Sequence, residues 1–184
     1  MSMSCGGITA VCRFLARVGG LVVVLLQGAC STGSARPSVD SGQPPGRFRI
    51  VIDIGHFPRG GSVPLKGQGM ISARGVDEFD LNRRAARSIA KALRDSTSAE
   101  VIVYNEDGLE RDLRHRTFRA QELGADLFLS IHHDAVDSSE ASKWSFKGIE
   151  RLYCDSVSGF SLWVHDSCTG FPEAFAMARS IGRS

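Results

Sequence analysis

Three residues with metal-binding side chains, His56, Glu78 and His132, stand far apart in the chain. Two imidazole nitrogens and one carboxylate suit zinc, and catalytic zinc sites typically have three protein ligands and keep a fourth position for water. Zinc held in this way lowers the pKa of water to about 7 and polarises a substrate carbonyl. If the fold brings the three side chains together, they could support hydrolysis of an amide without a nucleophilic side chain.

Each of the three residues also has an ordinary structural explanation. A histidine beside a glycine-rich loop, such as His56, is more often a hydrogen-bonding surface group than a ligand. A glutamate at a helix N-terminus interacts favourably with the helix dipole, which would account for Glu78. His132 could be a buried, hydrogen-bonded histidine. The metal-site hypothesis therefore depends on whether the surrounding elements place these residues at one edge of the fold.

Short apolar and β-branched runs predict strands at residues 48–54, 100–104 and 126–131. Helices are predicted over 80–94 and 113–123, because apolar side chains recur there at helical spacing. Their inward faces would be formed by Leu81, Ala85, Ile89 and Leu93 in the first helix and by Leu113, Thr117, Ala120 and Leu123 in the second. This alternation predicts an α/β fold, in which an open, mostly parallel, twisted sheet carries helices on both faces.

The predicted topology brings the three residues together. His56 lies just past the end of the first strand, and His132 lies at the end of the third. Glu78 lies at the start of the helix that follows the first strand and its long, glycine-rich loop. Because ligands of open α/β sheets collect at the carboxyl ends of the strands, we expect the three side chains to meet at that rim.

Each of these residues lies in a longer segment that resembles a motif of one family. Residues 50–56 (IVIDIGH) resemble the opening strand of the zinc-dependent N-acetylmuramoyl-L-alanine amidases, which ends in Asp-Pro-Gly-His. Residues 75–82 (GVDEFDLN) are similar to the second motif, which reads Gly-Leu, one variable residue, then Glu-Lys-Asp-Leu-Asn. Residues 125–132 (ADLFLSIH) are similar to the third motif. The resemblance implies that His56, Glu78 and His132 bind one Zn²⁺ ion.

Two residues near the implied ligands are predicted to contact substrate. His133 stands where the family usually has a small residue, so it could be a substrate-contacting group, a proton carrier or a misassigned ligand. The family register favours His132 as the ligand. Asn82, the last residue of the second motif, is the other candidate for substrate binding.

The catalytic residue is left unassigned. Family members carry a catalytic Glu on a late strand that follows a further helix. Here residues 159–164 are predicted to form a strand and residues 173–181 to form that helix, while residues 134–158 are predicted to be irregular. No carboxylate after the third motif matches the expected context. We therefore expect a chain that is truncated relative to the family, with a sheet that lacks its last strand and is incomplete at its C-terminal end.

The resemblance implies a zinc-dependent hydrolase that cleaves the amide between N-acetylmuramic acid and L-alanine in peptidoglycan. Because the family's catalytic Glu is not found, two alternatives stay open. One is a catalytically inactive, membrane-tethered module that binds peptidoglycan or regulates its turnover, and the other is a truncated, poorly folded product. For either functional protein, peptidoglycan is the expected partner and a monomer is the expected state.

The first 30 residues have the composition of an export signal. Arg13 and Arg17 precede an apolar run at 18–26, which is too short to span a bilayer comfortably, and small residues follow before Cys30. This pattern predicts either a lipoprotein signal, with Cys30 lipidated as a membrane anchor, or a plain signal peptide. Residues 31–47 are predicted to be a flexible linker and residues 48–184 the amidase-like domain. The expected location is periplasmic, either free or anchored to the membrane and facing the periplasm.

The charge of the chain argues against nucleic acid as a partner, and its cysteines leave the presence of a disulfide open. The formal net charge is only +2, and the basic residues are scattered, so nucleic acid is not an expected partner. Cys154 and Cys168 lie in the predicted domain and could pair in an oxidising compartment or remain separate thiols.

Overall fold

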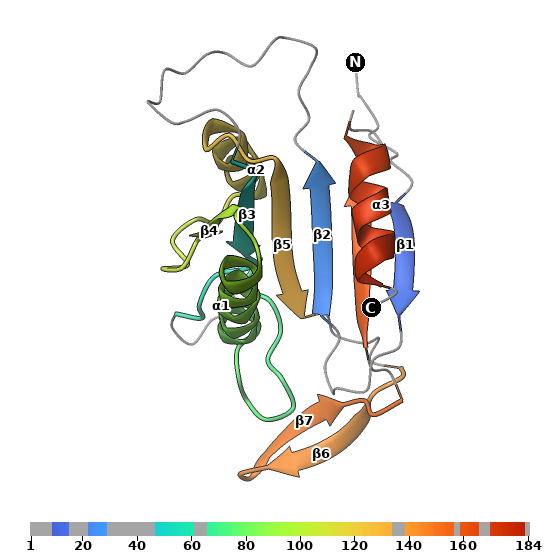
Figure 1. Ribbon diagram of the computed structural model, residues 1–184. Coiled ribbons are helices and arrows are strands. Elements are labelled where there is room, and N and C mark those ends of the chain that lie inside the picture. Colours follow the sequence, from blue (N-terminus) through green and yellow to red (C-terminus); the bar gives the residue numbers. More distant parts are fainter. Residues whose placement is uncertain are drawn as a thin grey trace, which may run out of the picture.

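The computed structural model of the protein describes residues 9–14, 22–28, 47–60, 66–133, 139–156, 159–165 and 170–182. A six-stranded sheet with the strand order β1-β8-β2-β5-β3-β4 forms its centre (Figure 1). The strands of this sheet are β1 (Thr9–Phe14), β2 (Val22–Gly28), β3 (Arg49–Ile54), β4 (Glu100–Tyr104), β5 (Leu127–His133) and β8 (Phe160–His165). A separate hairpin consists of β6 (Ser142–Phe146) and β7 (Ile149–Tyr153).

The strands β3, β4 and β5, which the sequence predicted, form a parallel part of the sheet. β3 pairs in parallel with β4 on one side and with β5 on the other. The crossovers contain α1 (Glu78–Ser96) and α2 (Leu113–Glu122). β2 pairs in parallel with β8, whereas β2 with β5 and β1 with β8 are antiparallel. The predicted α/β fold with a mostly parallel sheet is therefore confirmed.

Helices cover both faces of the sheet, as predicted. α1 and α3 (Phe171–Ile181) pack on one face, where alanines of both helices meet the aliphatic side chains of β3, β5 and β8. α2 packs on the opposite face, where Ala120 meets Val51 and Phe128. Because alanine side chains are small, α1 and α3 can approach the sheet closely.

The orientation of α1 differs from the prediction, whereas that of α2 agrees with it in part. α1 buries Phe79, Asn82, Ala86 and Ala90, while the predicted inward residues Ala85, Ile89 and Leu93 are only partly buried at the side of the core. Of the inward residues predicted for the second helix, Ala120 and Leu123 pack against the sheet, but Leu113 is 67% exposed. The long side chain that α2 buries is Arg116. A pattern that counts only apolar side chains does not predict that a charged residue is buried.

Arg116 is buried because it neutralises a buried carboxylate. Its side chain and that of Asp53 are each 2% exposed, and Arg116 Nη1 lies 3.3 Å from Asp53 Oδ2. Ser130 donates its hydroxyl to the same carboxylate oxygen at 2.7 Å. Arg116 also donates to the carbonyl of Ile54 at 2.9 Å. The pair therefore links α2 to the carboxyl ends of β3 and β5.

The hairpin is a correction to the sequence prediction, which expected residues 134–158 to be irregular. Its two-residue turn consists of Lys147 and Gly148, with φ angles of +52° and +76°. Two consecutive positive φ angles match the right-handed twist of the flanking strands, and they define the turn type preferred in short hairpins. The predicted strand at 159–164 and helix at 173–181 are confirmed as β8 and α3.

Two strands come from the predicted export signal. Thr9–Phe14 and Val22–Gly28 form β1 and β2, and β2 lies between β5 and β8. A short apolar run rich in valine suits either a signal core or a buried strand, so its pattern does not separate the two. The export signal, the domain boundary at residue 48 and the missing last strand stay predictions. Among the described residues, no helix is long and apolar enough to cross a membrane.

Several predictions fall on residues that the structure does not describe. These are the lipidation of Cys30, the linker except for its last residue, and the pairing of Cys154 with Cys168, because Cys30 and Cys168 lie outside the described residues. The sulfur of Cys154 lies 3.2 Å from the hydroxyl oxygen of Ser156.

We predict that replacing Arg116 by methionine lowers the free energy of unfolding by about 3–5 kcal/mol, because it leaves the buried Asp53 carboxylate uncompensated. Urea unfolding of the full chain measures this change. Arg119→Met is the matched control, since Arg119 pairs with Glu122 on the surface of the same helix and such pairs contribute about 0–1 kcal/mol. Equal losses for the two variants would contradict the structural role of Arg116.

Candidate metal centre

The site begins where β3 ends, at Gly55 and His56. The amide of Gly55 donates to the carbonyl of Ile131 at 3.0 Å, which continues the pairing of β3 with β5. A Cβ atom at Gly55 would lie only 2.5 Å from Cε1 of His132. Glycine is therefore required at this position, because its missing side chain lets the His132 ring lie against the β3 backbone.

His56 has a left-handed backbone conformation, with φ of +65°. This conformation costs a non-glycine residue roughly 1–2 kcal/mol. It is held by two hydrogen bonds to the His56 carbonyl, from Arg116 Nη2 at 2.6 Å and from Asn105 Nδ2 at 3.0 Å. The same two side chains also donate to the carbonyl of Ile54. The buried Asp53–Arg116 pair therefore fixes the direction in which His56 leaves the strand.

The ring of His56 is oriented by a backbone carbonyl. Its Nδ1 lies 2.9 Å from the carbonyl oxygen of Gly67. A carbonyl oxygen only accepts hydrogen bonds, so Nδ1 carries the proton and donates it. In the neutral ring this leaves the lone pair on Nε2, which points toward Glu78. A hydrogen bond donated by the second ring nitrogen is the usual way in which a protein fixes a metal-binding histidine.

Glu78 is the first residue of α1 and is only 4% exposed. Its Oε2 accepts a hydrogen bond from the amide of Met70 at 2.9 Å, and its Oε1 accepts one from the amide of His133 at 3.1 Å. Oε1 also lies 2.9 Å from His56 Nε2 and 3.6 Å from His132 Nδ1. One carboxylate oxygen therefore faces both histidines while the other is held by the preceding loop.

The three ligand atoms fit a single metal ion. His56 Nε2 and His132 Nδ1 lie 3.0 Å apart, and the distances from Glu78 Oε1 to them are 2.9 and 3.6 Å. A tetrahedral zinc ion with bonds of about 2.0–2.1 Å would hold its ligand atoms about 3.3 Å apart. Two imidazoles and one carboxylate are also a ligand set of catalytic zinc. Among the described residues, these three are the group of histidine, cysteine and acidic side chains that could hold an ion.

The charges at the centre perturb the titration of two ligands. Burial alone would raise the pKa of Glu78, but hydrogen bonds from His132, His56 and the Met70 amide outweigh it and hold that pKa well below its usual range. Burial alone would lower the pKa of His56, but the hydrogen bond and charge of Glu78 outweigh it, so the pKa of His56 is raised above 6.5. Glu78 is therefore ionised at neutral pH, as a metal ligand must be.

The comparisons with known proteins bear on this geometry. A family model described as N-acetylmuramoyl-L-alanine amidase matches residues 50–183, which include all three ligand candidates. The chain belongs to this amidase family. Family membership confirms the resemblance inferred from the three sequence motifs. No protein with curated annotation matches.

Two solved structures of amidases are similar to the chain. The N-acetylmuramoyl-L-alanine amidase from Clostridium difficile 630 matches at 25% sequence identity and a TM-score of 0.44, over 53% of this chain and 50% of that chain. The N-acetylmuramoyl-L-alanine amidase AmiC2 of Nostoc punctiforme matches at 16% identity and a TM-score of 0.44, over 74% of this chain and 95% of that chain. This chain thus spans about half the length of the clostridial protein.

The structure places the two predicted substrate-contacting residues of this amidase family member beside each other. His133 Nδ1 lies 2.7 Å from Asn82 Oδ1, and Asn82 Nδ2 donates to the carbonyl of Gly55 at 3.1 Å. Asn82 is fully buried, whereas His133 is half-buried. The buried amide therefore orients the His133 ring next to the candidate metal ligands.

The sequence analysis did not identify the residues that orient the three candidate ligands. Arg116 and Asn105 hold the His56 carbonyl, and Gly69 leaves room beside His56 and Glu78, where a Cβ would lie 2.7 Å from Glu78 Oε2. An arginine on the expected inner side of a helix, opposite an aspartate in a buried strand, was the available signal for the Arg116 pair. The sequence carried no comparable signal for Asn105.

We predict that the metal-free protein loses stability as pH rises through the raised pKa of His56. A raised pKa means that the folded state binds this proton more tightly than the unfolded chain, so the stabilisation is fully present below pH 6.5 and disappears above the raised value. Glu78→Gln should remove this dependence, because the carboxylate is what raises the pKa. Urea unfolding with chelator at about pH 6 and about pH 8.5 measures the difference.

The exposed Glu106 provides the control for that pH dependence. Glu106→Gln should keep the wild-type difference in stability between the two pH values. A pH dependence that is unchanged in Glu78→Gln would contradict the assigned coupling between Glu78 and His56.

Proposed function

We propose that the protein is a zinc-dependent amidase that hydrolyses the amide between N-acetylmuramic acid and L-alanine in peptidoglycan. The observation that carries the proposal is the convergence of His56, Glu78 and His132, whose ligand atoms lie within 4.8 Å of one another. Membership of the amidase family supplies the substrate class. The donor set and its spacing support one zinc ion as the cofactor.

The chain would contribute a ligand set whose geometry is already formed. Bound zinc would supply Lewis-acid chemistry, because it lowers the pKa of water and polarises a carbonyl. His56 presents Nε2 because its Nδ1 is bound to Gly67, and Glu78 presents one oxygen because Met70 holds the other. Since these side chains need little rearrangement to bind the ion, the binding free energy is not consumed in ordering them.

We also propose that His133 contacts the substrate. It follows His132 at the end of β5, and its amide already donates to Glu78. The bond from its ring to Asn82 fixes the direction of the imidazole beside the proposed zinc. Asn82 is too deeply buried for direct contact, so we propose that it acts through His133 as a positioning residue.

The purified full chain should bind about one zinc ion and release stem peptides from peptidoglycan. Glu78→Ala should lose both properties, because it removes the only anionic ligand of the set, whereas Glu106→Ala should keep both. Metal analysis by mass spectrometry and chromatography of the released muropeptides measure the two properties. A Glu78→Ala variant that retains stoichiometric zinc would refute the ligand assignment.

The same experiment separates the main proposal from its alternative. Zinc binding without peptide release would show a peptidoglycan-binding or regulatory module rather than an enzyme. His133→Ala should keep zinc and lower kcat/KM by about three- to tenfold, which is the effect of losing one hydrogen bond to substrate. An unchanged kcat/KM would remove His133 from the substrate site.

A further inference from the structure

The residues that precede Glu78 form a small closed turn, which we call the Glu78 loop (residues 70–77). Ile71 and Asp77 form an antiparallel bridge at its base. Within the loop, the amide of Ser72 donates to the carbonyl of Val76 at 2.9 Å, and the amide of Gly75 donates to the carbonyl of Ser72 at 2.8 Å. These bonds make the loop a compact unit whose tip consists of residues 73–75.

The position of the Glu78 carboxylate depends on this loop. Met70 donates its amide to Glu78 Oε2 at 2.9 Å, and the amide of Glu78 donates back to the carbonyl of Met70 at 2.9 Å. Both the backbone and the side chain of Glu78 are therefore tied to the residue at the start of the loop. A shift of the loop would move the ligand oxygen relative to His56 and His132.

The tip of the Glu78 loop is held by the β6–β7 hairpin, which lies beyond the carboxyl end of β5 (Figure 1). Trp144 donates its indole N–H to the carbonyl of Ala73 at 3.1 Å. The Arg151 guanidinium lies over Gly75, where an added Cβ would be 3.0 Å from Nη2. Trp144 and Arg151 are opposite each other in the hairpin, so both project from one face of it.

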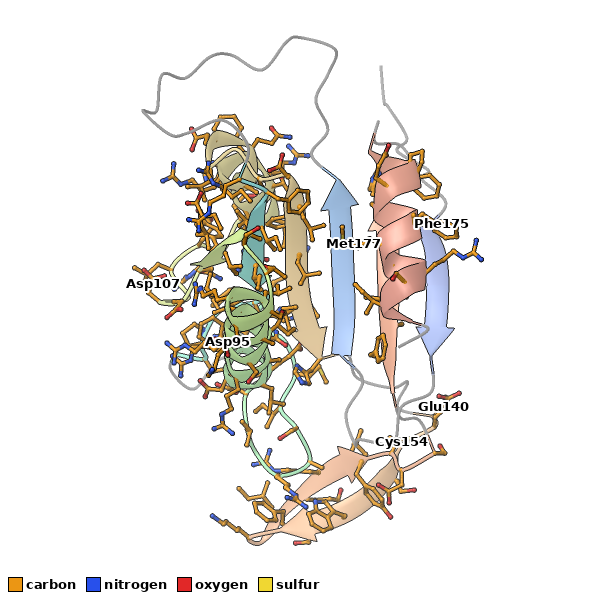
Figure 2. The ribbon with its side chains drawn as sticks, in the orientation of Figure 1. Asp95, Asp107, Glu140, Cys154, Phe175 and Met177 are labelled. Atoms are coloured by element: carbon orange, nitrogen blue, oxygen red, sulfur yellow. The ribbon has the colours of Figure 1, made fainter. Side chains whose placement is uncertain are left out.

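The hairpin has no other described partner in the sheet. Neither β6 nor β7 pairs with the six-stranded sheet, and Trp144 remains 39% exposed although it stacks on Phe146. Figure 2 shows Glu140 and Cys154 at the base of the hairpin, away from its turn. The contacts of Trp144 and Arg151 with the Glu78 loop connect this hairpin to the candidate metal centre.

We propose that the β6–β7 hairpin is a positioning element for the metal centre, with Trp144 and Arg151 as the positioning residues that hold the Glu78 loop. This inference rests on the proposed zinc site. Docking of the hairpin favours the loop conformation in which Glu78 faces the two histidines, so it raises metal affinity. Because coupling between two equilibria is reciprocal, metal binding must strengthen the docking of the hairpin by the same factor.

Trp144→Phe tests the proposal, since phenylalanine keeps an aromatic ring and removes the N–H that holds Ala73. We expect this variant of the full chain to bind zinc about three- to tenfold more weakly, as the loss of one hydrogen bond predicts. Trp163→Phe is the matched control, because Trp163 makes an equivalent N–H bond to Ser161 within β8. It should bind zinc with wild-type affinity, measured by competition with a chromogenic chelator.

The reciprocal effect gives an independent measurement. The chain has two tryptophans, so Trp163→Phe leaves Trp144 as the only indole and Trp144→Phe leaves only Trp163. Zinc should change the emission of Trp144 with the affinity found by competition, and it should leave the emission of Trp163 unchanged. Wild-type affinity in Trp144→Phe, together with a Trp144 emission that ignores zinc, would overturn the proposal while leaving the zinc site intact. Failure of the wild-type chain to bind zinc would overturn both.

Discussion

The buried ion pair between Asp53 and Arg116 is the constraint on which the candidate site depends. Both groups are removed from water at the carboxyl end of β3, and further hydrogen bonds are needed to offset the free-energy cost of that desolvation. Ser130 and the backbone carbonyls of Ile54, His56 and Glu110 supply such bonds, although Arg116 Nε has no partner among the described residues. One of the carbonyls is that of His56, so the charge balance of the core also holds a strained ligand residue in place.

The sheet and α1 bring the other two candidate ligands to His56. β5 lies beside β3 in parallel register, which places His132 next to the end of β3, and Gly55 leaves room for its ring. Glu78 reaches the same place at the start of α1, with its carboxylate charge held by both histidines and by the Met70 amide. The Glu78 loop and the hairpin then influence the candidate metal centre indirectly, through the position of the Glu78 carboxylate.

The parts of this arrangement that could be predicted are those with a local pattern. The strands β3, β4 and β5, the crossover helices and the convergence of the three ligand candidates follow from apolar periodicity and from the topology of α/β sheets. Arg116 was not predicted to be buried, because apolar periodicity carries no information about a buried charge pair. The hairpin depends on a Lys147–Gly148 turn, which lacks the usual asparagine or aspartate signal. The apolar run at Val22–Gly28 suits either the core of a signal peptide or a buried strand, so its pattern could not decide between them.

We propose that His56, Glu78 and His132, which come from three separate elements, hold a single zinc ion. X-ray absorption spectroscopy at the zinc edge, on the full chain loaded with one equivalent of zinc, tests it most directly. We expect two imidazole ligands, with only nitrogen and oxygen donors at about 2.0–2.2 Å, and the loss of this signal in Glu78→Ala. A sulfur donor at about 2.3 Å, which would place zinc on a cysteine, or a spectrum unchanged by Glu78→Ala would contradict it.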